Sequence, residues 1–202
     1  MLPGPSEIVV LADEGADPRF VAADLLSQAE HGWGGASGCI TNCADLAERV
    51  QAEVVTQLAA LSRNEIMAQA LHEYGAIVVV PDIEAGVELL NQMAPEHAEL
   101  LVADPWSWVD KIRHCGALFL GSASTEPVGD YFAGTNHVLP TNGAARYASS
   151  LGLADFVKTT SIIAYTDERL QGTGEHIIRM ARAEGLEAHA RAVSVRQDRR
   201  AE

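Results

Sequence analysis

The sequence predicts an α/β fold, a Rossmann-like parallel sheet flanked by helices, followed by a small and mainly helical C-terminal module. Apolar runs of strand length alternate with helical segments as far as Pro140, and parallel strands require such crossovers. The clearest run is 77–80, Ile-Val-Val-Val, which is β-branched throughout and ends at Pro81. After Pro140 the alternation stops. We therefore expect one domain over residues 1–150 and a separate module over 151–202.

Proline, leucine and valine positions predict where the helices lie. Asp17-Pro18 and Asp104-Pro105 each place an N-cap residue before a proline at the first helical position. Between residues 44 and 61, leucines and valines recur at helical steps and give one apolar face. The expected strands are 8–11, 39–41, 77–80, 100–102 and 118–120, and the expected helices are 18–31, 44–61, 84–93, 105–115 and 174–183.

The composition is that of a globular protein from a reducing compartment. Hydrophobic residues make up 48% of the 202 residues and charged residues 21%, which suffices for a core. A net charge of −14 opposes binding to nucleic acid, which requires a basic surface. The sequence contains no apolar run of the roughly 18 residues that a membrane helix needs, and its first residues lack signal-peptide features. We expect a cytoplasmic protein with no nucleic-acid or membrane partner.

Several familiar motifs are absent. The cysteines Cys39, Cys43 and Cys115 are odd in number and lack a disulfide spacing, which fits the cytosol, and no second metal-binding pair follows the first two. The glycine-rich stretch 32–38 is not a dinucleotide fingerprint, because Ser37 stands where the third glycine is needed and the stretch follows a helix. The residues that would bind a nucleotide cofactor therefore stay unassigned.

The segment 129–140 is the strongest local candidate for a functional site. It carries Asp130 and His137 in a stretch broken by glycines and closed by Pro140, and such loops present side chains outward. Asp and His are also common zinc ligands. Both residues could instead stabilise the loop through hydrogen bonds, and the local pattern leaves that alternative open.

Two further polar pairs accompany this segment. Gln28 and His31 are three residues apart, so they share a helix face and could hold one metal ion, although a solvated helix end gives the same pattern. Glu96 and His97 are adjacent, so we expect their side chains to diverge and to serve different acid–base roles, with an exposed turn as the alternative. The remaining histidines His72, His114 and His176 are expected in amphipathic helices and receive no function.

Six sequence blocks are spread from one end of the chain to the other. They are Gly-Pro-Ser-Glu at 4–7, Ser-Gln-Ala-Glu-His at 27–31, Ala-Pro-Glu-His at 94–97, the stretch 129–140, Ser-Ser-Leu-Gly at 149–152, and Glu-Gly-Leu with Ala-His at 184–189. In their order and nearly in their spacing, these blocks resemble the histidinol dehydrogenase family. The resemblance implies a zinc enzyme of histidine biosynthesis that oxidises L-histidinol through L-histidinaldehyde to L-histidine with two NAD.

The resemblance also implies roles for individual residues. His97 would take the alcohol proton, and Glu96 would activate the water that hydrates the aldehyde. The zinc ligands would be Gln28, His31, Asp130 and His189. Substrate contacts would come from Ser6, Gln28, His31, His97, Asp130, His137, Glu184 and His189. The family is homodimeric, and the C-terminal module with Glu184 and His189 would act in the partner's site.

Chain length separates this protein from the family. Family members are about twice as long, and the chain resembles only their C-terminal half, so its Rossmann-like sheet would be incomplete and the NAD-contacting part would be missing. This leaves three alternatives. The chain could be a catalytically silent or split fragment that needs a separate NAD-binding half. It could be a related zinc and NAD dehydrogenase of another small alcohol, or a zinc hydrolase in which Glu96 activates water.

Overall fold

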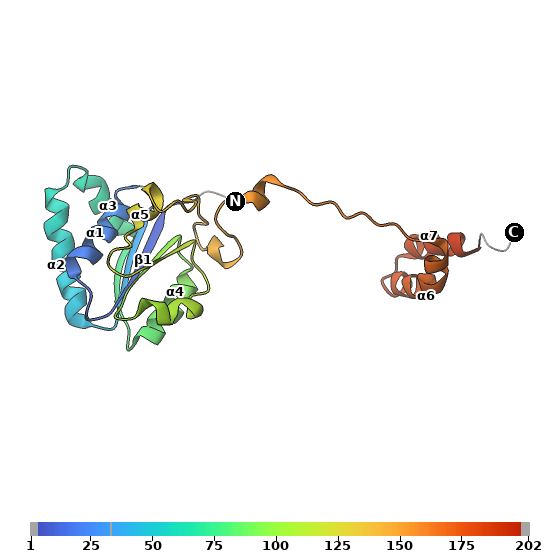
Figure 1. Ribbon diagram of the computed structural model, residues 1–202, viewed down its shortest axis with the longest axis horizontal. Helices are drawn as coiled ribbons and strands as arrows, with labels where there is room; N and C mark the ends of the chain where they lie inside the picture. Colours follow the sequence, from blue (N-terminus) through green and yellow to red (C-terminus); the bar gives the residue numbers. More distant parts are fainter. Residues whose placement is uncertain (1–3, 33, 199–202) are drawn as a thin grey trace. The chain divides into compact units, whose positions relative to one another are not determined.

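A five-stranded parallel sheet between two layers of helices forms the larger part of the protein (Figure 1). The computed structural model describes residues 4–32 and 34–198. It consists of two compact units, Met1–Val157 and Lys158–Glu202, and the sheet belongs to the first. The predicted α/β class, with a helical C-terminal part, is confirmed.

The strand order is β3-β2-β1-β4-β5, and every neighbouring pair is parallel. The chain therefore builds the sheet outward from β1 in one direction and then returns to the other side of β1, so the winding reverses between β1 and β4. The strands are β1 (Glu7–Ala12), β2 (Ala36–Thr41), β3 (Gly75–Val79), β4 (His97–Leu101) and β5 (Ala117–Leu120).

Helices cover both faces of this sheet because the strands are apolar on both sides. In β1, Ile8 and Val10 pack in one cluster with α1 and α2, whereas Val9 and Leu11 pack in a second cluster with α4. Figure 1 shows α1, α2 and α3 on one side of the sheet and α4 on the other. The helices of this unit are α1 (Pro18–Ala29), α2 (Ala44–Ala60), α3 (Asn64–Tyr74), α4 (Ile83–Met93) and the short α5 (Glu126–Tyr131).

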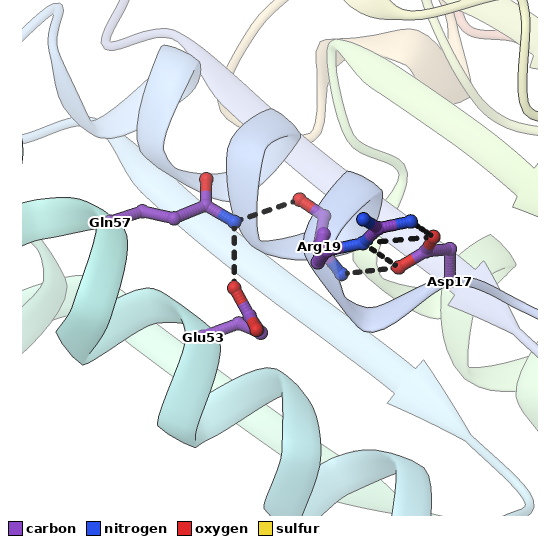
Figure 2. Close-up of polar contacts among 4 residues, drawn as sticks. All are labelled: Asp17, Arg19, Glu53 and Gln57. Atoms are coloured by element: carbon purple, nitrogen blue, oxygen red, sulfur yellow. Dashed lines mark hydrogen bonds and ion pairs between the residues drawn. The ribbon is translucent and has the colours of Figure 1, made fainter.

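Polar contacts at the start of α1 connect it to α2 (Figure 2). The Asp17 carboxylate caps the helix by accepting a hydrogen bond from the Arg19 backbone N–H at 2.9 Å. It also accepts a hydrogen bond from the Arg19 guanidinium group. These bonds lower the pKa of Asp17 to about 2. On α2, the Gln57 amide donates to the Arg19 carbonyl at 3.0 Å and to Glu53 at 3.2 Å. The Gln57 side chain thus holds the start of α1 against α2.

Several elements differ from their sequence-based prediction, and α3 lies in none of the predicted ranges. Strand β4 begins at His97, three positions before the predicted 100–102, because Glu99 interrupts the apolar run while being buried. The predicted loop 129–140 begins inside a helix, since α5 spans Glu126–Tyr131. The predicted helix 105–115 is a 3-10 helix that ends at Lys111.

The Asn91 side chain explains the early end of that 3-10 helix. Its amide donates to the Lys111 carbonyl at 2.9 Å, and its oxygen accepts the backbone N–H groups of Arg113 at 2.6 Å and His114 at 3.3 Å. Backbone groups held in this way are unavailable to a longer helix. His114 therefore lies in a bend, and its predicted helical placement is wrong.

The second unit is a helical hairpin. Helix α6 (Asp167–Ala183) begins at Thr166, whose hydroxyl accepts the Arg169 N–H at 3.1 Å, and α7 (Glu187–Gln197) packs against it. Its core consists of Ile178, Ala181 and Ala190. The prediction of a helix near 174–183 missed the start of α6 and the whole of α7. Within the residues described, the structure contains no helix long and apolar enough to cross a bilayer.

Leu90 of α4 provides a test of the packed faces. Its side chain is fully buried in the cluster that contains Val9 and Leu11. Replacing it with alanine should lower the free energy of unfolding by about 2–5 kcal/mol, because burial is lost and a cavity remains. Urea unfolding followed by circular dichroism measures the change. Leu153, with 80% of its side chain exposed, is the matched control, and its alanine variant should unfold like the parent. Equal midpoints for the two variants would contradict this packing.

Candidate functional site at the amino edge of the sheet

Most of the sequence-predicted site residues lie at the amino-terminal edge of the central strands. Ser6 directly precedes β1, and Glu96 and His97 stand at the start of β4. The parallel register pairs Ile8 with His97, which brings the segments before both strands together. Because α1 runs back against the direction of the strands, its C-terminal end with Gln28 returns toward this edge.

Glu96 is held by the segment that leads into β1. Its Oε2 accepts a short hydrogen bond from the Ser6 hydroxyl and a second one from the Glu7 backbone N–H at 3.1 Å. The carboxylate is buried. Its other oxygen, Oε1, takes no part in these two bonds, so one oxygen is fixed and the other is free to accept a proton.

His97 has a defined tautomer. Its Nδ1 lies 3.0 Å from the Glu7 carbonyl oxygen, which can only accept, so Nδ1 carries the proton. Nε2 is buried and has no hydrogen-bond partner. Burial lowers the pKa of His97, against the opposing effect of Glu96. The ring is therefore neutral near pH 7, with a free lone pair on Nε2, as a general base requires.

The expected divergence of the Glu96 and His97 side chains is wrong. Glu96 Oε2 lies 3.6 Å from His97 Nδ1. Glu96 occupies a bend before β4, so strict alternation does not apply to it. Because His97 is neutral, the contact becomes an ion pair only when the imidazole takes up a proton.

A set of metal-donor atoms lies at the same edge. Donor atoms of His31, Glu126 and Asp130 all lie within 4.8 Å of one another. Gln28 is fully buried, and neither its amide nitrogen nor its amide oxygen has a hydrogen-bond partner. An unpartnered buried amide is costly unless a ligand satisfies it. Nitrogen and oxygen donors of this kind suit zinc, so these residues fit the predicted metal.

Two details of this set were not predicted. α1 ends at Ala29, so His31 lies in the turn beyond the helix and does not share a helix face with Gln28. Glu126 was missed, although its place four residues before Asp130 puts both carboxylates on one side of α5. Burial and the nearby Asp130 raise the pKa of Glu126 to about 7.

Gly129 lets α5 approach the sheet closely. A Cβ at this position would lie 2.7 Å from the Phe119 ring of β5, which is closer than packed atoms tolerate. The Phe119 ring in turn lies 6.0 Å from the His97 ring, centroid to centroid. Because Gly129 has no side chain, α5 with its metal donors packs directly against β5, the strand next to the one that carries His97.

Two open pockets adjoin these groups. The first, of about 370 Å³, is lined by His31, Glu126 and Asp130 together with Arg63. The second, of about 600 Å³, is lined by Glu96 and by His137, which is itself exposed in the loop after α5. Either volume exceeds that of a small amino alcohol.

The remaining predicted site residues lie in the second unit. Glu184 is the C-cap of α6 and His189 lies in the first turns of α7, and both are exposed. Their roles as a substrate contact and as a zinc ligand stay predictions from the sequence.

The crevice where such sheets usually bind nucleotides lies at the opposite, carboxyl edge. It measures about 390 Å³ and is lined by residues that follow β1, β4 and β5, among them Asp13 and Asp17. The Asp13 carboxylate already accepts the backbone N–H groups of Gly15 and Ala103. Two carboxylates and occupied amides do not suit a diphosphate, so in the described part of the chain this crevice does not fit NAD.

The fold and the amino edge define a parallel α/β protein that combines a buried neutral base with a metal-donor set. The histidinol dehydrogenase family profile matches residues 1–197, and this chain belongs to that family. The resemblance to this family is thereby confirmed, and its restriction to the C-terminal half stays a prediction.

Individual relatives agree with the family match but are longer. Histidinol dehydrogenase of Halalkalibacterium halodurans is 55% identical over 196 residues, which cover 97% of this chain and 46% of that protein. The enzyme of Geobacillus kaustophilus is 51% identical over 199 residues, covering 98% and 47%. The crystal structure of histidinol dehydrogenase from Elizabethkingia anophelis superposes with a TM-score of 0.83 at 42% identity, covering 100% of this chain and 46% of that one. The chain thus spans a little under half the length of these relatives.

The tautomer of His97 is directly testable. We expect ¹⁵N NMR of the folded protein to show His97 with its proton on Nδ1 at neutral pH and with a pKa below the usual value of 6.5, since burial disfavours the charged ring. The His97→Asn variant assigns the resonances. A proton on Nε2, or titration above pH 6.5, would contradict the assigned arrangement.

Proposed function

We propose that the protein carries the metal and acid–base half of a zinc-dependent histidinol dehydrogenase, which oxidises L-histidinol through L-histidinaldehyde to L-histidine in the last steps of histidine biosynthesis. The observation that carries the proposal is a buried, neutral His97 with a free Nε2, on the same sheet edge as an unpartnered Gln28 and a His31–Asp130 donor pair. NAD would accept the hydride, as the resemblance implies.

His97 would remove the alcohol proton at Nε2. Its Nδ1–H bond to the Glu7 carbonyl holds the ring in the tautomer that leaves Nε2 unprotonated. Once Nε2 takes the proton, the imidazolium gains the Glu96 carboxylate at 3.6 Å as its counter-ion. The base is therefore neutral before proton uptake and stabilised after it, which is the differential effect that catalysis needs.

Glu96 would act in the second half-reaction. Ser6 and the Glu7 amide hold Oε2, and Oε1 is left to accept a proton from the water that hydrates the aldehyde. The hydrated aldehyde then presents a second hydroxyl to His97. One base and one carboxylate at fixed positions thus serve both oxidations.

Gln28, His31 and Asp130 would hold zinc, with His189 as the fourth ligand predicted from the sequence. When bound, zinc would supply a Lewis acid that orients the amine and imidazole of histidinol. The acidic surroundings favour a cationic substrate, because Glu126 and Asp130 line the adjoining pocket and the chain carries a net charge of −14. Glu184 is the further predicted partner for the substrate amine.

A second reading is favoured by the length of the chain. Since it spans less than half of its relatives, and since the crevice at the carboxyl edge does not fit NAD, the hydride acceptor would be held by a separate polypeptide or a partner subunit. The protein would then be a split or catalytically silent half. A homodimer with shared sites and a cytoplasmic location remain predictions of the same proposal.

Turnover tests the proposed function. Zinc-loaded protein is given L-histidinol and NAD, alone and with the remaining half of a relative, and NADH is followed by absorbance. We expect His97→Asn to lower the rate by about 10²–10⁴-fold, since general-base assistance is lost. His114→Asn is the matched control and should keep the parent rate. Equal rates for the two variants would contradict the assigned base, and turnover only with the added half would identify a split enzyme.

Metal binding tests the donor set independently of turnover. We expect Asp130→Ala and His189→Ala each to weaken zinc binding by more than roughly 10–100-fold, the loss typical when a residue that only hydrogen-bonds to a metal ligand is replaced. Competition with a chromophoric chelator gives the dissociation constants. Asp110→Ala, an exposed acid of the 3-10 helix, is the control and should bind zinc like the parent. An unchanged affinity in Asp130→Ala would remove Asp130 from the site.

A further inference from the structure

We propose that Glu99 is a positioning residue for the metal centre: from the middle of β4 it bridges α1 and the start of α5, and so fixes the carboxylates of α5 opposite His31. The inference rests on the proposed metal site, but it assigns a role to a residue that none of the steps above uses.

Glu99 occupies a position where the sheet would otherwise place an apolar side chain. It lies two residues after His97 on the same face of β4, while Ala98 and Leu100 face the opposite core cluster. Its side chain is only 1% exposed. Burying a carboxyl group is costly unless it is hydrogen-bonded, so its contacts must compensate.

Its contacts join three elements. Glu99 Oε1 accepts the Glu126 backbone N–H at the start of α5, at 2.8 Å. Burial and the neighbouring Asp24 carboxyl on α1 raise the pKa of Glu99. Asp24 Oδ1 accepts the Thr125 hydroxyl at 2.5 Å, which returns the network to α5. Ser27, one turn further along α1, donates to Glu126 at 3.3 Å.

The second oxygen of Glu99 indicates its protonation state. Oε2 is buried and meets no N–H or O–H donor among the described residues. Two neighbouring buried carboxyl groups also disfavour carrying two negative charges, because like charges repel at short range. A neutral amide of the same shape should therefore replace Glu99, whereas an apolar side chain should not.

α5 depends on this network because it buries little else. It is six residues long, and only Glu126 and Gly129 are buried. Tyr131 and the following Phe132 are 86% and 93% exposed. Apolar packing therefore contributes little to the position of the helix, and the polar bonds at its first turn set where Glu126 and Asp130 lie relative to His31.

The test compares two substitutions in the full chain, with zinc affinity and the visible spectrum of the cobalt-loaded protein as readouts. Glu99→Gln keeps an acceptor for the Glu126 N–H and gains a donor for Asp24, so zinc affinity should stay within about threefold of the parent and the cobalt spectrum should not change. Glu99→Leu keeps the size but removes the acceptor for the Glu126 N–H and the polar group beside Asp24, so affinity should fall about 10–100-fold and the cobalt bands should shift.

Two further variants separate positioning from general destabilisation. Asn91→Leu removes a buried polar anchor on the other side of the sheet, so it should lower stability and leave zinc affinity unchanged. Thr125→Val breaks the same network from its α5 end without touching the strand, and it should weaken zinc binding even if Glu99→Leu fails to fold. Parent-like zinc affinity and cobalt spectra in Thr125→Val or Glu99→Leu would overturn the role of Glu99 alone. Absence of zinc binding by the parent would instead overturn the proposed metal site.

Discussion

The parallel pairing of β1 with β4 is the constraint on which the site depends. Its register sets Ile8 beside His97 and thereby places Ser6 and the Glu7 backbone against Glu96 and the imidazole. A shift by one residue would turn the base to the opposite face of the sheet, away from α1 and α5. The apolar alternation of β1 against both helix layers opposes such a shift, so packing of the core and orientation of the base are determined by the same contacts.

Burial on one face of the sheet sets the protonation states of the acidic groups Glu99 and Glu126. Burial and the neighbouring Asp24 raise the pKa of Glu99 to about 9, so it is a neutral hydrogen-bonding group at pH 7. Glu126, with a pKa raised to about 7, sits at the boundary between both forms. His97 is neutral on the same face. A cation bound beside Glu126 and Asp130 would therefore relieve repulsion that the protein otherwise reduces by protonation.

Sequence patterns predicted the sheet better than the site. Strand runs and N-cap prolines gave the order of the strands, and family-like blocks pointed to Glu96 and His97. The start of β4 could not be predicted, because an acidic residue such as Glu99 normally indicates an exposed position and here it is buried within the strand. Helix α5 was hidden because Gly129 reads as a loop signal, whereas here it permits close packing on Phe119. Glu126 belongs to no quoted block, and only its contacts in three dimensions place it among the donors.

The amino edge of the sheet, and not the crevice at its carboxyl edge, is the functional site that we propose. Diffraction from zinc-loaded crystals at the zinc absorption edge tests this most directly, because anomalous scattering locates the metal without reference to activity. We predict the strongest peak among Gln28, His31 and Asp130, with the Gln28 amide oxygen as a ligand. A strongest peak beside Asp13 and Asp17 instead would contradict the account.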